Sequence, residues 1–407
     1  MSQAKSTLTA IEEVGFRDEV REWLAANFPP SLTGDGEAQR RILKDSELIT
    51  GDLLLWRERM GGKGWAVPTW PAEYGGGGLS AAQARVLNEE MTAAGAFNPI
   101  DGPGVMMFGP TLLEYGTEDQ KQEHLRGIAS GKVRWCQGFS EPGAGSDLAS
   151  LSTRADEHGD HFLVNGSKIW TSRGAQADMM FCLVRTDFSR KHDGISFVVF
   201  EMHQPGVKIR PIRLISGISP FCEVFFTDVK VPKANLIGPL NGGWTVAKRL
   251  LQHERSNMVM GGGTKGDAGI PLAKLAKKYV GEDQAGRIAD SHLRMRIVDN
   301  EVDERAVQLT VRRIAEEAKG GSGPSTASSI LKNVGMKVLQ DKAELALEIM
   351  GYQGLGWEGE HFSDDELSTV REWLAGKAFS IFGGSHEVQN NIIAKRILGL
   401  PDPSQGR

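Results

Sequence analysis

The chain has 407 residues, which is long for one hydrophobic core, so two or three packed regions are expected. Apolar residues make up 40% and charged residues 24% of the chain, as in ordinary globular proteins. The formal net charge of −5 argues against a nucleic-acid-binding surface. It leaves room for a phosphorylated small-molecule ligand, because a few placed donors can bind one.

Cysteine usage and hydropathy indicate the compartment. The three cysteines lie far apart without a CxxC pair, and we expect neither a disulfide framework nor a metal site. The first ten residues are polar and lack the apolar core of a signal peptide, and the longest apolar runs are too short to span a bilayer. These features favour a cytoplasmic protein with no membrane partner.

The first third of the chain is predicted to be helical. Apolar residues between Phe16 and Leu24 recur at helical spacing, and this helix should stop at Pro29–Pro30. Further helices are expected at 80–95 and, opening with a Thr-x-x-Gln capping box, at 117–131. We assign residues 1–132 to an N-terminal α-helical domain.

A change of pattern at Val133 marks a middle β region, in which short apolar runs alternate with polar residues and turn signals. Asn165–Gly166 separates Phe162–Val164 from Lys168–Trp170. Because Asn-Gly tolerates the positive φ of a tight turn, this pattern predicts a hairpin. We assign 133–236 to a β-barrel or β-sandwich domain. Further strands are expected at 179–184, 195–200 and 223–226.

The helical period returns after Pro232 and holds to the end of the chain. We assign 237–407 to a C-terminal four-helix bundle, so the fold class is α+β with several domains. Helices are expected at 244–260, within 286–319, from Pro324 to Gly351, and from Ser385 to Gly399. The second of these helices carries an apolar face of Ile288, Met295, Val298, Val302 and Leu309.

Two segments of the β region suit ligand binding. In Phe139–Asp147, Gly143 and Gly145 remove side chains, so backbone N–H groups can approach a ligand, and two serines add hydroxyl donors. In Ile169–Ser172, a tryptophan beside two hydroxyls suits a flat ring system. The alternatives are a tight turn between strands for the first segment and a buried strand tryptophan for the second.

Two helical segments suit catalysis. Glu254 falls within an apolar stripe, where a carboxylate is either neutralised by a partner or desolvated with a raised pKa that suits a proton-abstracting base. The alternative is a structural glutamate paired with an arginine elsewhere. Gly383 and Gly384 open a helix and expose N–H groups at its positive end, where an anionic or polarised oxygen could bind. The alternative is an ordinary helix start with no role in binding. The stripe consists of Trp244, Ala247, Leu250, Leu251 and Met258.

Together these segments resemble the acyl-CoA dehydrogenase family, in the family's order and over almost the whole chain. The motifs that carry the resemblance are Gln137–Asp147 with SEPGAGSD, Val164–Ala175, Phe226–Pro232 and Ile381–Leu400. The resemblance implies FAD bound between the β domain and the bundle and across a subunit interface. It also implies dehydrogenation of an acyl-CoA to the trans-2-enoyl-CoA, with electrons passed to electron-transferring flavoprotein.

The resemblance also implies roles for individual residues. The residues expected to contact the flavin ring, or to bond near its N5, are Phe139, Ser140, Trp170 and Ser172. Gly145 is also expected to contact the cofactor, and Ser146 is expected to contact its pyrophosphate. Contacts to FAD across a subunit interface fall to Gly351, Tyr352, Ser385 and Glu387, although Tyr352 replaces the usual glycine. Substrate contacts fall to Ser146, Gln252 and Gly384, and an acyl pocket is expected near Met106, Met107 and Tyr115.

One departure from the family pattern decides the expected base. Medium-chain members carry their catalytic glutamate where this chain has Gly383, whereas the isovaleryl-CoA and long-chain branches place it on the helix after the β domain, before an arginine. That position is held here by Glu254, followed by Arg255. We expect Glu254 to take the pro-R α-proton while a β-hydride passes to flavin N5, with the backbone N–H of Gly383 donating to the thioester carbonyl.

The resemblance leaves three alternatives open. The same fold serves acyl-CoA oxidases and flavin monooxygenases, and some relatives are one subunit of a heteromeric dehydrogenase. We therefore expect a homodimer or homotetramer, or a heteromer with a paralogue.

Overall fold

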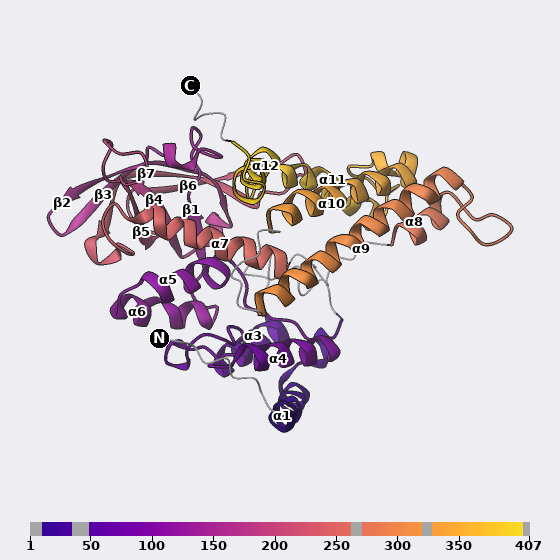
Figure 1. Ribbon diagram of the computed structural model, residues 1–407, viewed down its shortest axis with the longest axis horizontal. Coiled ribbons are helices and arrows are strands. Elements are labelled where there is room, and N and C mark those ends of the chain that lie inside the picture. Colours follow the sequence, from indigo (N-terminus) through magenta and orange to yellow (C-terminus); the bar gives the residue numbers. More distant parts are fainter. Residues whose placement is uncertain (1–9, 35–48, 262–270, 320–327, 402–407) are drawn as a thin grey trace. The chain divides into compact units, whose positions relative to one another are not determined.

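The computed structural model describes residues 10–34, 49–261, 271–319 and 328–401, which form two compact units (Figure 1). The first unit holds the described residues up to 254 except 213–219, and the second holds 213–219 and the described residues from 255 onward. Along the chain, an N-terminal helical domain, a middle β domain and a C-terminal helical domain follow one another, which confirms the predicted fold class.

The N-terminal helices begin where the sequence signals them. Ser80 and Thr117 each cap a helix through a complete capping box, with Gln83 and Gln120 as the reciprocal partners. The apolar side of the first helix is buried, with Val20 fully enclosed. The helices are α1 (Ala10–Asn27), α3 (Gly51–Lys63), α4 (Ala81–Ala93), α5 (Gly109–Tyr115) and α6 (Glu118–Ala129).

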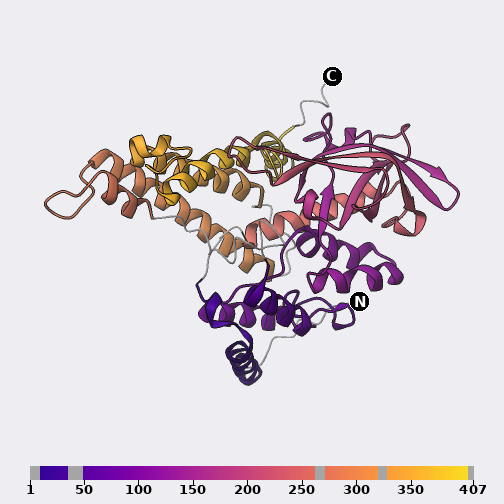
Figure 2. The same ribbon diagram turned by 180° about the vertical axis from the view of Figure 1, so that it is seen from behind.

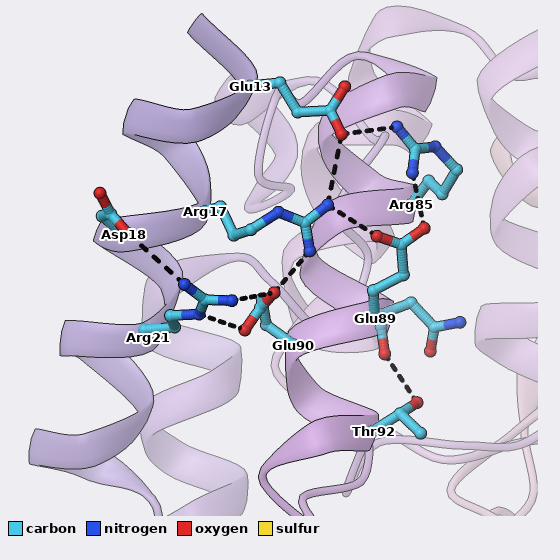
Figure 3. A network of polar contacts seen from close by, with 9 residues as sticks. Glu13, Arg17, Asp18, Arg21, Arg85, Glu89, Glu90 and Thr92 are labelled. Atoms are coloured by element: carbon cyan, nitrogen blue, oxygen red, sulfur yellow. Dashed lines mark hydrogen bonds and ion pairs between the residues drawn. The ribbon is translucent and has the colours of Figure 1, made fainter. Parts of the chain in front are cut away.

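A network of ion pairs joins α1 to α4 (Figure 3). Arg17 and Arg21 of α1 both contact the buried Glu90 of α4, at 2.5 Å from Nη1 to Oε1 and 2.7 Å from Nε to Oε2. Arg17 also pairs with Glu89 at 2.8 Å. The hydrogen bond from Arg21 holds the pKa of Glu90 below its ordinary value. The network therefore anchors α1 by charge as well as by its apolar side.

The middle domain is built on one seven-stranded sheet with the order β1-β4-β2-β3-β7-β6, in which β5 also pairs with β4. Side chains of β4 alternate between two cores: Phe181 and Leu183 pack in the cluster that includes α7, and Met180 and Cys182 in the cluster enclosed by β3 and β7. Figure 2 shows the sheet from behind. The strands are β1 (Trp135–Gly138), β2 (Arg154–His158), β3 (His161–Ser172), β4 (Met179–Arg185), β5 (Ile195–Glu201), β6 (Val207–Ile212) and β7 (Phe221–Pro232).

The predicted hairpin at Asn165–Gly166 is wrong, because β3 runs through this dipeptide as one strand. The turn lies between β2 and β3, where His158 pairs with His161. At Gly166, φ is +146° and a Cβ atom would lie 2.7 Å from Oγ1 of Thr153, so the glycine serves a close approach at a register shift. Asn165 instead donates a hydrogen bond to Asp228 across the sheet, at 2.9 Å.

The second unit is helical, and α10 contacts each of the other helices in it (Figure 1). The predicted helix starting at Ser385 is confirmed, and Ser385 caps it. The predicted start at Pro324 lies outside the described residues. The helices are α8 (Leu272–Tyr279), α9 (Ser291–Lys319), α10 (Ser328–Met350), α11 (Asp364–Gly376) and α12 (His386–Ile392).

Of the apolar face predicted for the helix within 286–319, Ile288 is buried, but the other four residues are not covered by the described residues of this unit. Leu293 and Ile297 supply buried contacts instead, on another side of the helix. Four members of the predicted face are 48–65% exposed: Met295, Val298, Val302 and Leu309.

None of the described helices is long and apolar enough to cross a membrane. All three cysteines are buried and free. Among the described residues, no cluster of His, Cys, Asp or Glu has the composition to hold a metal ion.

Candidate active site

The segment after β1 forms a tight turn whose glycines are exposed. Glu141 and Ala144 exchange two backbone hydrogen bonds, of 2.9 and 3.0 Å, so the turn expected as an alternative is present. Gly143 and Gly145 are exposed, and a Cβ atom on either would meet no other atom within 4 Å. Packing among the described residues of this unit does not explain these glycines. Their open space is what a ligand lying against the backbone requires.

The buried carboxylate of Glu141 anchors this turn to neighbouring segments. Glu141 accepts hydrogen bonds from the backbone N–H groups of Ser152 and Thr153, at 2.7 and 2.9 Å. Its Oε1 also lies 2.7 Å from Nζ of Lys168, whose side chain is fully buried. Burial opposes ionisation, but the Lys168 charge and these hydrogen bonds lower the pKa of Glu141 to about 2. The carboxylate therefore stays charged and fixes the backbone of the turn.

The sequence reasoning missed this pair, although a signal was present. Phe162 and Val164 face the core, and at the strand period of two Lys168 falls on the same face. A lysine at an inward position requires a buried acidic partner. Glu141, in the motif Phe139–Asp147, was an available acidic residue.

The second predicted segment lies beside the first. The backbone N–H of Ile169 donates to the carbonyl oxygen of Ser140 at 2.9 Å, so the two predicted contact residues Ser140 and Trp170 come from adjacent backbones. Trp170 is 53% exposed and has φ of +61°, at a register shift of β3. An exposed, strained tryptophan is uncommon in a strand and typical of a ligand site. Ser172 is half-buried on the same segment.

The contact of Phe139 with the flavin ring stays a prediction. Its side chain is buried and packs edge-on against Phe181 and Phe197, with ring centroids 5.9 and 6.1 Å away. Any contact it makes to a ligand above the turn is through its backbone. Ser146, by contrast, is exposed.

The helix α7 (Gly243–Gly261) carries Glu254 and is fixed to the sheet at its start. A Cβ atom on Gly243 would lie 2.4 Å from the carbonyl carbon of Ser196 in β5, so helix and strand backbones are in direct contact. Ala247 and Leu250 are fully buried, as the predicted stripe requires. Glu254 continues the same side of the helix and is half-buried. The side chains of Arg255 and Met258 lie outside the description.

A polar cluster lies next to Glu254 that the sequence did not reveal. Arg249 of α7 forms a two-pronged ion pair with Glu114 of α5, with both distances 2.7 Å. It also donates to Oε1 of Gln252, the predicted substrate contact, at 3.0 Å. His253 lies 3.2 Å from Glu114, and burial together with the Arg249 charge lowers the pKa of this histidine. The cluster ties α7 to α5.

The remaining predicted residues belong to the second unit. Gly383 and Gly384 both have positive φ, and a Cβ atom on Gly384 would lie 2.6 Å from the amide nitrogen of Gln389. Ser385 and Glu387 lie at the start of α12. Gly351 directly follows α10 with φ of +55°, and Tyr352 after it is 90% exposed. That these residues act together with Glu254 stays a prediction.

Three domain models match the chain in order. The N-terminal domain of acyl-CoA dehydrogenases matches residues 11–132, the middle domain matches 136–229 and the C-terminal domain matches 241–398. The chain is 34% identical to the acyl-CoA dehydrogenase IpdE1 of Mycolicibacterium smegmatis, over 97% of this chain and 100% of that protein.

Solved structures agree. A structure of the ChsE4–ChsE5 complex from Mycobacterium tuberculosis superposes with a TM-score of 0.72 at 29% identity, over 98% of this chain and 100% of that one. The Tcur3481–Tcur3483 steroid ACAD superposes with a TM-score of 0.74 at 28% identity, over 97% and 99%. The chain belongs to the acyl-CoA dehydrogenase family and is an oxidoreductase of that type. Members of this family are FAD-dependent flavoproteins.

Proposed function

We propose that this protein binds FAD and removes two hydrogens across the Cα–Cβ bond of an acyl-CoA, which yields the trans-2-enoyl-CoA. Two features support FAD binding in the first unit. The turn at 141–144 has open space over Gly143 and beside it Gly145, and Trp170 presents an exposed ring on the adjacent segment. Backbone N–H groups at such a turn suit a pyrophosphate, and the indole face suits a flat ring.

Glu254 is the proposed base. The observation that carries this role is its half-buried position on the apolar side of α7, a helix whose first turn is locked against β5. Contact with a bound substrate would exclude more water and raise the carboxylate pKa toward neutrality, which suits proton abstraction. The backbone N–H of Gly383 is proposed to donate to the thioester carbonyl oxygen. Bound FAD would supply the acceptor for the β-hydride, and electron-transferring flavoprotein would take the electrons.

The test is anaerobic flavin reduction in Glu254→Gln. Loss of a positioned base typically costs about 10²–10⁴-fold, and loss of the only base should reach the upper end of that range. Glu123→Gln, on the exposed side of α6, is the matched control and should reduce flavin at the wild-type rate. Wild-type rates in Glu254→Gln would overturn the assignment. Peroxide release during aerobic turnover would show instead that dioxygen is the acceptor.

We further propose a bulky, ring-bearing acyl group and assembly with another chain. Two structures that superpose on this chain are named as a steroid ACAD and as a complex of two differently named chains. The exposed apolar face of α9 supports assembly, since isolated helical surfaces rarely leave four large apolar residues in water. Light scattering of the protein expressed alone tests this, and a monomer at micromolar concentration would favour a missing paralogue as partner.

A further inference from the structure

One acidic side chain of α5 contacts two successive turns of the helix that carries the proposed base. Glu114 accepts two hydrogen bonds from Arg249, from Nε to Oε2 and from Nη2 to Oε1, both 2.7 Å long. Oε1 of Glu114 also lies 3.2 Å from Nε2 of His253, although the geometry is not that of a hydrogen bond. Arg249 and His253 are four residues apart and therefore lie on one face of α7.

The contact between Glu114 and Arg249 fixes an orientation as well as a distance. A guanidinium that donates two parallel hydrogen bonds to one carboxylate is held in one plane with it, unlike a lysine in a single ion pair. Nη1 of Arg249 also donates to Oε1 of Gln252 at 3.0 Å, which holds the arginine along its own helix. Because Glu254 follows His253 directly, at about 100° around the helix, the same turn of α7 sets the direction of the Glu254 side chain.

The segment that carries Glu114 is joined to the expected acyl pocket. α5 continues directly from the π-helical turn Gly104–Phe108, which holds Met106 and Met107. The fully buried Thr111 of α5 donates from Oγ1 to the carbonyl oxygen of Met107 at 2.7 Å, so the two segments are bonded to each other. π-Helical turns are frequent at functional sites. Glu114 therefore connects the segment of the expected acyl pocket to the turn of α7 that carries the base.

We propose that Glu114 is a positioning residue for the reaction and that, through Arg249, it sets the direction in which Glu254 approaches the α-carbon of the substrate. This inference rests on the proposed function, in which Glu254 takes the α-proton. The hydrogen bond between Glu114 and Arg249 lowers the pKa of the first and raises that of the second, so both stay charged near neutral pH.

The size of the expected effect follows from the exposure of the pair. Both side chains are more than a third exposed, and ion pairs of this kind contribute little to stability. A displacement of about 1 Å at a reacting group, by contrast, can lower a rate by about 10²-fold. Breaking the pair should therefore slow proton abstraction far more than it weakens the fold.

The first test measures anaerobic flavin reduction, per bound flavin, with the acyl-CoA that reduces the wild-type flavin fastest. Glu114→Gln should lower the limiting rate by about ten- to hundredfold and leave the dissociation constant of the substrate nearly unchanged. Arg249→Lys, which keeps the charge and loses the fork, should lie between the wild type and Glu114→Gln.

A matched control comes from the network between α1 and α4 (Figure 3). The side chain of Glu89 is 43% exposed, against 38% for Glu114, and it pairs with Arg17 of the neighbouring helix at 2.8 Å. Glu89→Gln therefore breaks a comparable ion pair between two helices. It should reduce flavin at the wild-type rate per bound flavin.

A second readout isolates the proton step. The 3-thia analogue of the same acyl-CoA has sulfur in place of the β-carbon, so no β-hydride can leave. In D₂O, Glu254 takes an α-proton, the carboxyl group exchanges it with solvent, and the α-carbon takes back a deuteron. Mass spectrometry of the recovered thioester measures this uptake. Glu114→Gln should slow deuterium uptake by about the same factor as flavin reduction, and Glu89→Gln should leave it unchanged.

Three results would overturn the proposal. They are deuterium uptake at the wild-type rate in Glu114→Gln, an equal loss in Glu89→Gln, and a loss confined to the dissociation constant of the substrate, which would give the pair a role in binding. Failure of the proposed function is distinguishable from these, because it would appear as wild-type deuterium uptake and flavin reduction in Glu254→Gln.

Discussion

The buried pair of Glu141 and Lys168 provides the sharpest test of how the proposed flavin-binding turn is held. In Glu141→Gln, one carboxylate oxygen becomes an NH₂ group that faces hydrogen-bond donors, because Ser152 and Thr153 already donate to both oxygens. Lys168, with no exposed surface, would keep only neutral acceptors, namely the amide oxygen of the new side chain and the carbonyl oxygen of Phe139 at 3.2 Å. The substitution thus leaves a buried charge without its counter-ion.

Two independent estimates of the unfolding free energy lost in Glu141→Gln agree. Removing one partner of a buried ion pair typically costs about 3–5 kcal/mol. Separately, the pKa of Glu141 falls from 4.5 to about 2, which at about 1.36 kcal/mol per pH unit corresponds to roughly 3 kcal/mol. Because total stabilities are about 5–15 kcal/mol, this is a large loss.

Urea unfolding of the purified variant at neutral pH measures this loss. Glu157→Gln is the control, since Glu157 of β2 is exposed and pairs with Lys233 at the surface, where an ion pair contributes at most about 1 kcal/mol. A depressed carboxyl pKa means that the stabilisation is complete above pH 4.5 and is lost as the pH falls toward 2. The gap between wild type and variant should therefore narrow in acid. A loss below about 1 kcal/mol at neutral pH would refute the reasoning.

Two further predictions concern the scaffold. Gly243→Ala should destabilise the protein by more than about 1–3 kcal/mol and lower the rate of flavin reduction, because its Cβ atom would overlap the backbone of Ser196. The control is Gly15→Ala on the exposed side of α1, which should be neutral or stabilising. Equal urea midpoints for the two variants would contradict this prediction. Burial lowers the pKa of His124 below its ordinary value of 6.5, so the unfolded chain takes up a proton that the folded protein refuses. Stability should be complete above pH 6.5 and fall as the pH drops below it, and a His124→Gln variant with an equally steep acid slope would show that another group is responsible.

The local parts of the fold were predictable because their signals are local. Ser80 and Thr117 cap helices through partners three residues away, and this chemistry is present in the sequence before any folding. The apolar runs of β4 and β5 and the stripe of α7 followed from periodicity alone.

Other predictions failed or stayed open because they depended on distant contacts. Asn165–Gly166 has the chemistry of a turn, but pairing with Asp228 and close approach to Thr153 made it part of a continuous strand. The stripe of α9 was visible in the sequence, but whether it packs within this chain or against another was not.

By itself, the sequence determined the family, the order of the three domains and the candidate base at Glu254, since each is written in contiguous motifs or in helical spacing. Only the tertiary structure showed that Glu141 meets Lys168 and that Glu114 meets Arg249. These groups are separated by tens of residues along the chain, and their charges acquire chemical meaning only when folding brings them together and removes water from between them.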